Sequence, residues 1–293
     1  MTFQRFQIIA MFLLLGLAAA GAVSLGVFGL QLGIDFTGGS LLEAEYAFSR
    51  PTVAEIRESL QGLAVGSPTV QPIGERGVLL RMKDIDEPLH QEVLSALGTE
   101  AEELRFESIG PVIGRELRER TILLSLFAVL AVVLYIAFAF RQTAEGIRPW
   151  HWSGAALVAS LHDMLIPLGI FALLGTLLQV QFTIPVVVAL LTVVGYSIND
   201  TVVVFDRMRE NLRQHTGFDL ADTVKQSLRQ TWVRSLSTSL TTLAVLFSIY
   251  LFGGSTLQHF SLMLILGIVA GTLSSLFLAP SLLLLWRGAF VKR

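Results

Sequence analysis

Residues 8–30 read IIAMFLLLGLAAAGAVSLGVFGL, and no charged side chain interrupts them. The hydrocarbon core of a bilayer is about 30 Å thick, so a helix needs about 20 apolar residues to cross it. The small residues Ala18-Ala19-Ala20 resemble a signal-peptide cleavage site. However, the apolar run is longer than the roughly 7–15 residues of a signal peptide. We therefore expect an uncleaved transmembrane helix.

Five further stretches have the same length and character. They are Thr121–Phe140, Trp152–Leu174, Phe182–Phe205, Ser235–Phe252 and Phe260–Trp286. The composition agrees, because 53% of the 293 residues are hydrophobic and only 15% are charged, whereas a soluble domain carries about 25% charged residues. We predict an all-α membrane bundle of six transmembrane helices.

Composition also excludes several functions. The net charge of −2 gives no basic surface for nucleic acid. The chain has no cysteine, which excludes disulfides, thiol catalysis and cysteine-bound metals. The five histidines are scattered without the spacing of metal ligands. We expect no catalytic residues, no metal and no cofactor, and therefore not an enzyme.

Lysine and arginine in the short loops predict the orientation, because they concentrate on the cytoplasmic side. The loops near Leu177–Gln181 and Gly253–His259 contain none. The other ends of the predicted helices carry Arg5, Arg141, Arg148, Arg207, Arg209, Arg213, Lys225, Arg229, Arg287, Lys292 and Arg293. Both termini are therefore predicted to be cytoplasmic, and membrane lipid surrounds the helices.

Residues 33–118 have the composition of a water-soluble domain, which the orientation places in the periplasm. Alternating apolar residues predict strands near 42–48, 69–73, 78–83 and 104–109. Thr52 and Glu55 have the spacing of a capping box that opens a helix, and a second helix is expected at Pro88–Leu97. The order β-α-β-β-α-β predicts an α+β ferredoxin-like domain inserted after the first span.

The third predicted span carries His162 and Asp163 four to five residues before Pro167. Ionisable groups inside a membrane are costly, and they usually face a bundle interior or a water path. Pro167 cannot donate to the helix ladder beside Asp163. Two interpretations stay open: Asp163 takes part in proton transfer, or it and His162 only hydrogen-bond a neighbouring helix.

The fourth and fifth spans carry Asp200 and Arg234 at comparable depth from the cytoplasmic surface. A carboxylate can bind or lose a proton, whereas a guanidinium stays charged. An Asp200–Arg234 pair would therefore respond to protons, and we predict a proton relay of Asp200, Arg234 and Asp163. The alternative is that Arg234 reaches the headgroups and these charges only anchor the helices. The predicted supporting polar residues are His162, Ser197, Asn199, Thr238 and Thr241.

Four motifs in this order resemble the SecF family of bacterial protein-export membrane proteins. They are GIDFTGGS at 33–40, His162-Asp163, VGYSINDT at 194–201 followed by FDRMREN at 205–211, and RSLSTSLTT at 234–242. The resemblance extends from the first span to the sixth and so covers nearly the whole chain. It implies membership of the resistance–nodulation–division superfamily and a place in the bacterial cytoplasmic (inner) membrane.

The resemblance also implies partners and a role. Family members pair with SecD, associate with the SecYEG channel, and use the proton motive force to promote preprotein translocation after SecA-driven insertion. It implies that Asp200 is the family's intramembrane aspartate and Arg234 its partner. The same resemblance suggests contacts with YajC-type and YidC-type membrane subunits and with the preprotein.

Other functions are compatible with the residues alone. A stand-alone small-molecule or ion transporter of the same superfamily is one, although six spans make half of such an architecture, and a passive scaffold is another. Sodium could replace the proton, and the chain could be a free subunit or the second half of a SecD–SecF fusion. The predicted organisation is a first helix at 1–32, the periplasmic domain at 33–118, and five helices at 119–293 with cytoplasmic loops at 141–151 and 206–233.

Overall fold

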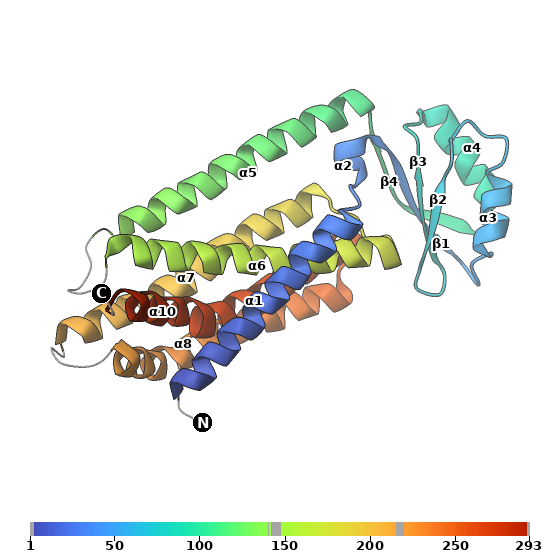
Figure 1. Ribbon diagram of the computed structural model, residues 1–293. Helices are drawn as coiled ribbons and strands as arrows, with labels where there is room; N and C mark the ends of the chain where they lie inside the picture. Colours follow the sequence, from blue (N-terminus) through green and yellow to red (C-terminus); the bar gives the residue numbers. More distant parts are fainter. Residues whose placement is uncertain (1–2, 140, 142–147, 215–219, 292–293) are drawn as a thin grey trace. The chain divides into compact units, whose positions relative to one another are not determined.

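The computed structural model describes residues 3–139, 141, 148–214 and 220–291. They form two compact units, each of which is described by itself (Figure 1). One unit consists of Met1–Gln31 and Leu124–Arg293, and the other of Leu32–Leu123.

Six helices are long and apolar enough to cross a membrane, as the sequence predicts. They are α1 (Phe3–Phe28), α5 (Pro111–Ala139), α6 (Pro149–Leu178), α7 (Ile184–Gln214), α8 (Leu220–Phe252) and a last span made of α9 (Ser255–Leu273), the π-helix η1 (Ser274–Leu278) and α10 (Ala279–Val291). The helices extend beyond the apolar stretches because their polar ends are also good helix formers.

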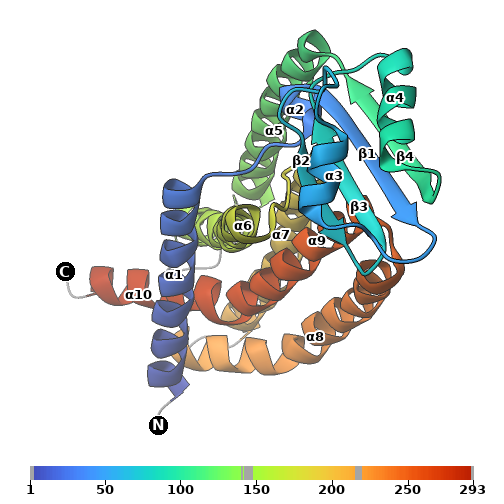
Figure 2. The same cartoon turned by 90° about the vertical axis from the view of Figure 1, so that its right-hand side faces the viewer.

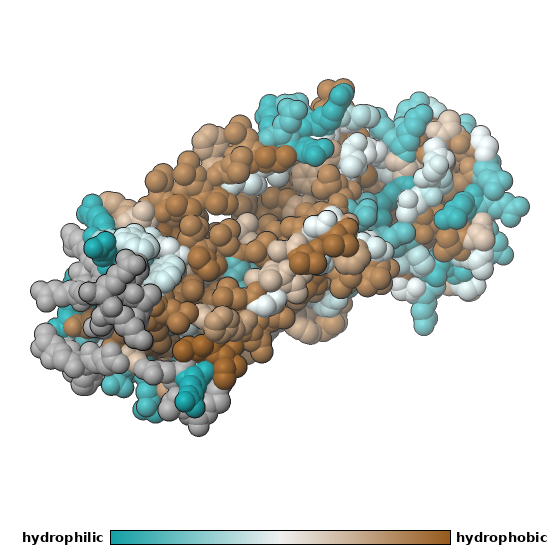
Figure 3. Space-filling view, viewed as in Figure 1, coloured by the Kyte–Doolittle hydropathy of each residue, from teal (hydrophilic) through white to brown (hydrophobic). Residues whose placement is uncertain are grey.

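The spans differ in how far they are buried within the chain. In the 18-residue apolar segment of each span, 67% of the residues are buried in the last span and 6% in α5. Helices α7 and α8 both pack against α9 (Figure 2). Apolar side chains cover much of the outer surface of the helical unit (Figure 3). The last span is therefore central, whereas α5 presents its side chains outward.

Helices α1 and α6 approach each other through glycines. A Cβ placed on Gly169 would lie 2.3 Å from the Cα of Gly21, and one on Gly21 would lie 2.5 Å from the Leu165 carbonyl oxygen. The hydroxyl of Ser24 also donates to the Gly169 carbonyl oxygen at 2.7 Å. Small residues allow such close backbone packing in membranes, where the hydrophobic effect does not drive helices together.

The segment predicted as a cytoplasmic loop at 206–233 is largely helical in its described residues. Helix α7 continues to Gln214 and α8 begins at Leu220. The extensions carry ion pairs along the helix, such as Arg209–Asp206 at 2.7 Å. They also bind each other, since the Asn211 amide donates to the Ser227 hydroxyl at 2.8 Å. In the other predicted loop, 141–151, residues 142–147 lie outside the described residues.

The second unit contains an antiparallel four-stranded sheet in the order β2-β3-β1-β4. Its elements are α2 (Ile34–Thr37), β1 (Gly39–Tyr46), α3 (Val53–Ser59), β2 (Thr69–Ile73), β3 (Gly77–Met82), α4 (Glu87–Leu97) and β4 (Ala101–Ile109). Helices α3 and α4 lie on one face of the sheet (Figure 2). Alternate residues of β1 and β3, among them Leu42 and Leu80, pack against Ile56 and Val93 of these helices.

The helix caps follow the sequence closely. Thr52 accepts from the Glu55 amide at 3.3 Å, and Glu55 accepts from the Thr52 amide at 2.7 Å, which completes the predicted capping box of α3. The two hydrogen bonds that Glu55 receives from the backbone and side chain of Thr52 hold the pKa of this carboxyl below its usual value. Helix α4 begins after Asp86, whose side chain accepts from the Leu89 amide.

Candidate functional site

Asp163 lies at the centre of a fully buried polar cluster in the helical unit. Its side chain is 0% exposed. One carboxylate oxygen lies 2.7 Å from Nδ1 of His162, and the other accepts from the hydroxyls of Ser197 on α7 and Ser274 on η1. A carboxylate can only accept, so the contact with His162 is a hydrogen bond in the tautomer that carries a proton on Nδ1. Asp163 therefore joins three helical segments, and each of its oxygens has a partner.

The π-helix η1 supplies the third donor. Ser274 is its first residue, and its hydroxyl lies 2.7 Å from Asp163. One turn earlier, a Cβ on Gly271 would lie 3.2 Å from the Ser197 Cβ and 3.5 Å from the Asp163 carboxylate. A glycine at this position thus lets the last span approach the cluster. Single π-turns inside long helices are frequent at functional sites.

Asp200 differs from Asp163 in its hydrogen bonding. It lies on α7 and is only 4% exposed. Its oxygen Oδ2 is buried and has no hydrogen-bond partner among the described residues. Ser197, one turn earlier on α7, donates to Asp163 rather than to Asp200. An incompletely satisfied buried carboxyl is costly, and such groups mark functional positions within membrane spans.

Arg234 lies on the exposed face of α8. It lies near enough to influence Asp200 electrostatically, but Oδ2 of Asp200 has no partner among the described residues, so Arg234 does not pair with this oxygen. The predicted pair is therefore an approach of two charges without direct contact. Closing it into a salt bridge requires movement of the Arg234 side chain or of α8.

The other predicted residues divide into two groups. His162 and Ser197 belong to the Asp163 cluster, whereas Asn199, Thr238 and Thr241 are exposed on the faces of α7 and α8. Thr238 contributes to the contact between α7 and α8 through its backbone, because the Tyr196 hydroxyl donates to its carbonyl oxygen at 3.1 Å.

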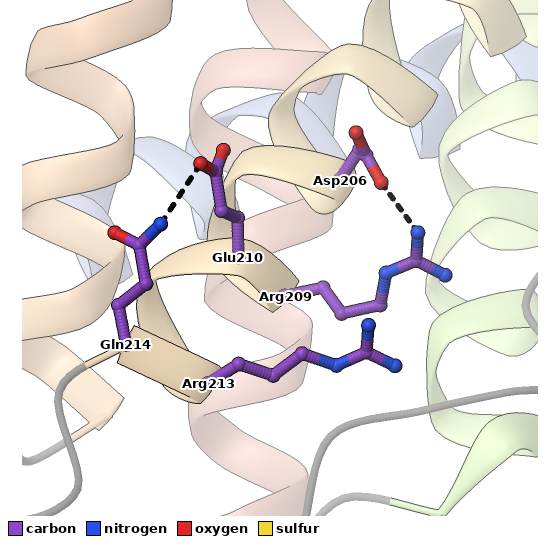
Figure 4. A pocket seen from close by; sticks show the side chains of 5 residues that line it. All are labelled: Asp206, Arg209, Glu210, Arg213 and Gln214. Atoms are coloured by element: carbon purple, nitrogen blue, oxygen red, sulfur yellow. Dashed lines mark hydrogen bonds and ion pairs between the residues drawn. The ribbon is translucent and has the colours of Figure 1, made fainter.

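A polar pocket of about 300 Å³ lies at the end of α7, away from these carboxyl groups. Its lining residues are Asp206, Arg209, Glu210, Arg213 and Gln214. Asp206 pairs with Arg209 and Glu210 accepts from Gln214 within it (Figure 4). All five residues belong to one helix, so the pocket is a groove along the surface of α7.

The two buried carboxyl groups differ in their hydrogen bonds: both oxygens of Asp163 have partners, whereas Oδ2 of Asp200 has none among the described residues. Asp163 has a donor for each oxygen and suits a role in fixing helix positions. Asp200 has one buried oxygen without a hydrogen-bond partner among the described residues, and the exposed Arg234 lies near enough to influence it electrostatically. The described residues contain no group of three or more acidic, histidine or cysteine side chains that would hold a metal ion. Proton binding at Asp200 is the chemistry that this geometry supports best.

Sequence reasoning missed several members of the site. Ser274, Gly271 and Tyr196 contribute hydrogen bonds or close approach, and none was predicted. The available signal is the run of small residues in the last span, Gly267, Gly271 and Ser274, at intervals of three and four. That spacing places small residues on one helix face.

Comparison with protein families identifies the chain. Residues 90–289 match the family "Protein export membrane protein SecD/SecF, C-terminal", and residues 23–47 match the SecD/SecF GG motif. The chain is 41% identical over 283 residues to the protein translocase subunit SecF of Thermobaculum terrenum, covering 91% of this chain and 87% of that protein. The SecF of Pseudomonas aeruginosa is 37% identical over 265 residues, covering 88% of this chain and 82% of that protein.

A solved structure agrees with these relatives. The crystal structure of SecDF, a translocon-associated membrane protein from Thermus thermophilus, superposes with a TM-score of 0.85 at 32% identity and covers 98% of this chain. This chain spans 39% of the length of that SecDF chain. The chain therefore belongs to the SecF family of protein translocase subunits.

Proposed function

We propose that this chain is an accessory subunit of bacterial Sec protein export, and that with SecD it uses the proton motive force to promote preprotein translocation through SecYEG after SecA-driven insertion. The observation that carries the coupling role is Asp200, a 4% exposed carboxyl inside a span with one oxygen unpartnered among the described residues. Protonation removes its charge and with it the attraction of Arg234. The site thereby has two states that differ in proton occupancy.

The energy of a proton gradient is sufficient for such a switch. Moving one charge through 100 mV is worth about 2.3 kcal/mol, and a pH difference of one unit adds about 1.4 kcal/mol. A ligand shifts an equilibrium from 1:99 to 99:1 with about 5.5 kcal/mol. One or two protons therefore suffice to move a conformational equilibrium that is already nearly balanced.

The exposed polar face of α8 supports pairing with SecD. Arg234, Thr238 and Thr241 are exposed in this chain although they lie within a span. A charged side chain is costly against lipid, so this face is expected to be covered by another membrane subunit or by water. SecD is the partner that the family relationship suggests, and YajC-type and YidC-type subunits are further candidates.

We also propose the orientation and the identity of the second unit. Lysine and arginine at one set of helix ends support cytoplasmic termini, which would place residues 33–118 in the periplasm. The strand order β2-β3-β1-β4 and the element order β1-α3-β2-β3-α4-β4 support a ferredoxin-like domain. A domain anchored at both ends to spans can follow a movement of the helices.

The test is export of a preprotein into inverted vesicles that contain this chain with SecD, SecYEG and SecA. We expect Asp200→Asn and Arg234→Met to remove the stimulation by a proton gradient and to leave the ATP-driven part and complex assembly unchanged. Asp206→Asn is the matched control, because this aspartate lies on the exposed part of the same helix. Normal stimulation in Asp200→Asn would refute the proposed coupling role.

A further inference from the structure

Two hydroxyl groups next in the chain to Asp200 and Arg234 are buried without a hydrogen-bond partner among the described residues. They belong to Thr201 on α7 and Ser235 on α8, and each residue is 1% exposed. Leaving such a group unsatisfied in a low-dielectric interior is costly. Together with Oδ2 of Asp200, three buried oxygen atoms on two adjacent helices therefore lack partners.

Other buried hydroxyls in these spans have a partner, either across helices, as Ser197 and Ser274 have in Asp163, or within their own helix. A serine or threonine in a helix can donate to the carbonyl four residues earlier. Thr231 and Ser261 do so at 2.9 and 2.7 Å. Thr201 and Ser235 depart from this pattern, so their hydroxyls are available to a ligand.

The helix register brings the two hydroxyls to the same level. Arg207 of α7 donates to Gln230 of α8 at 2.7 Å across the antiparallel pair. Thr201 lies six residues before Arg207, and Ser235 lies five residues after Gln230. Because a helix rises about 1.5 Å per residue, the two residues lie within about 1.5 Å of the same level along the helix axes. The neighbours of these hydroxyls in the chain, Asp200 and Arg234, are also close enough to interact electrostatically.

We propose that Thr201 and Ser235 hold a buried water molecule against Asp200, and that this water passes protons to and from the carboxylate. A buried water commonly makes about three hydrogen bonds, and these three oxygens supply that number. A proton that arrives on the water as hydronium transfers to Oδ2, which leaves a neutral water and a neutral carboxylic acid; release follows the reverse path. Thr201 and Ser235 are positioning residues in this scheme, which rests on the proposed function.

The same geometry disfavours sodium as the coupling ion. Sodium sites in transporters draw on carbonyl oxygens of unwound helices. Around Thr201 and Ser235, α7 and α8 are continuous α-helices, so their carbonyl oxygens accept within the helix. One carboxylate and two hydroxyls then provide three oxygen ligands from the two helices, which is sufficient for a water.

The first test measures gradient-stimulated export by the reconstituted complex with Thr201→Val and Ser235→Ala combined. We expect the stimulation to fall about tenfold, the value of one hydrogen bond to a charged group, with the ATP-driven part unchanged. Thr231→Val and Ser261→Ala combined is the matched control, because it removes two buried hydroxyls that bond within their own helices. Stimulation within twofold of wild type in the test pair, or equal losses in both pairs, would overturn the proposal.

The second test observes the water directly. The difference infrared spectrum between low and high pH should contain a water band that shifts in heavy-oxygen water and is absent from the Thr201→Val, Ser235→Ala chain. The control pair should keep it; a band unchanged by the test pair would overturn the proposal. Stimulation by a sodium gradient at equal pH, with none from a proton gradient, would overturn it as well.

The two proposals fail in different ways. If Asp200→Asn keeps its stimulation, the proposed coupling role is wrong, and the infrared band still decides whether the water is present. If Asp200→Asn loses its stimulation while the hydroxyl pair keeps it, the coupling role stands and the water is refuted.

Discussion

Ser274→Ala removes one of the three donors to Asp163 and provides a test of the polar cluster. The hydroxyl lies 2.7 Å from the carboxylate, which is 0% exposed and therefore out of contact with bulk water. A hydrogen bond to a charged group in a soluble protein contributes about 1.5–3 kcal/mol, whereas hydrogen bonds between membrane helices contribute about 0.6–1.7 kcal/mol. We therefore expect a loss of about 1–2 kcal/mol in the free energy of unfolding.

Unfolding of the full chain in mixed micelles with increasing SDS measures this loss. Tryptophan fluorescence reports on it, because Trp152 is buried against Phe205 with ring centroids 5.1 Å apart. Ser261→Ala is the matched control on the same span, since Ser261 is also fully buried but donates to the Leu257 carbonyl of its own helix. The control is expected to change stability by less than about 0.5 kcal/mol.

The result that would refute this reasoning is equal stability of Ser274→Ala and Ser261→Ala. A second outcome would refute the assignment of Asp163 to a fixing role. If Ser274→Ala keeps its stability but loses all gradient-stimulated export, the cluster takes part in coupling rather than in holding α6, α7 and η1 together.

The remaining predictions concern the contact between α1 and α6 and the cap of α3. Gly169→Ala places a Cβ 2.3 Å from Gly21 of α1, which should cost about 1–3 kcal/mol by overpacking; SDS unfolding should show no such loss for Gly16→Ala, whose Cβ meets nothing within 4 Å. The cap of α3 should weaken in acid. The folded pKa of Glu55 lies below the usual 4.5, so its contribution is complete above that pH and is lost as the pH falls through the lower folded value. Amide exchange of α3, corrected for intrinsic rates, should show this loss in wild type but not in Glu55→Gln, which keeps the acceptor without the charge.

The parts of the fold that the sequence predicts best are the transmembrane helices, from the length of each apolar run, and the helix caps, from local residue spacing. A run such as residues 8–30 has one stable solution in a membrane, because every backbone group must be satisfied within the helix. The Thr52 and Glu55 capping box depends on spacing alone and was confirmed. Helix α7 continues beyond the apolar run that ends at Phe205, because hydropathy marks where a helix leaves the lipid and not where it ends.

The candidate site was less accessible to sequence reasoning. Asp163, Asp200 and Arg234 stand out because charge is rare inside spans. The rarity of charge does not reveal the hydrogen-bond donors that Asp163 has and Asp200 lacks. Ser274, for example, lies more than 100 residues from Asp163 in the chain and reaches it from a π-helix. Ser197 was predicted only as a supporting polar residue, and it is the packing of α7 against α6 that directs its hydroxyl to Asp163.

The central claim is that Asp200 couples proton movement to export. The most direct measurement follows proton movement across the vesicle membrane with a trapped pH indicator while the reconstituted complex completes translocation of a stalled preprotein. We predict proton movement that accompanies completion in wild type and in Asp206→Asn, and its loss in Asp200→Asn. Completion without proton movement in wild type, or unchanged proton movement in Asp200→Asn, would contradict the account.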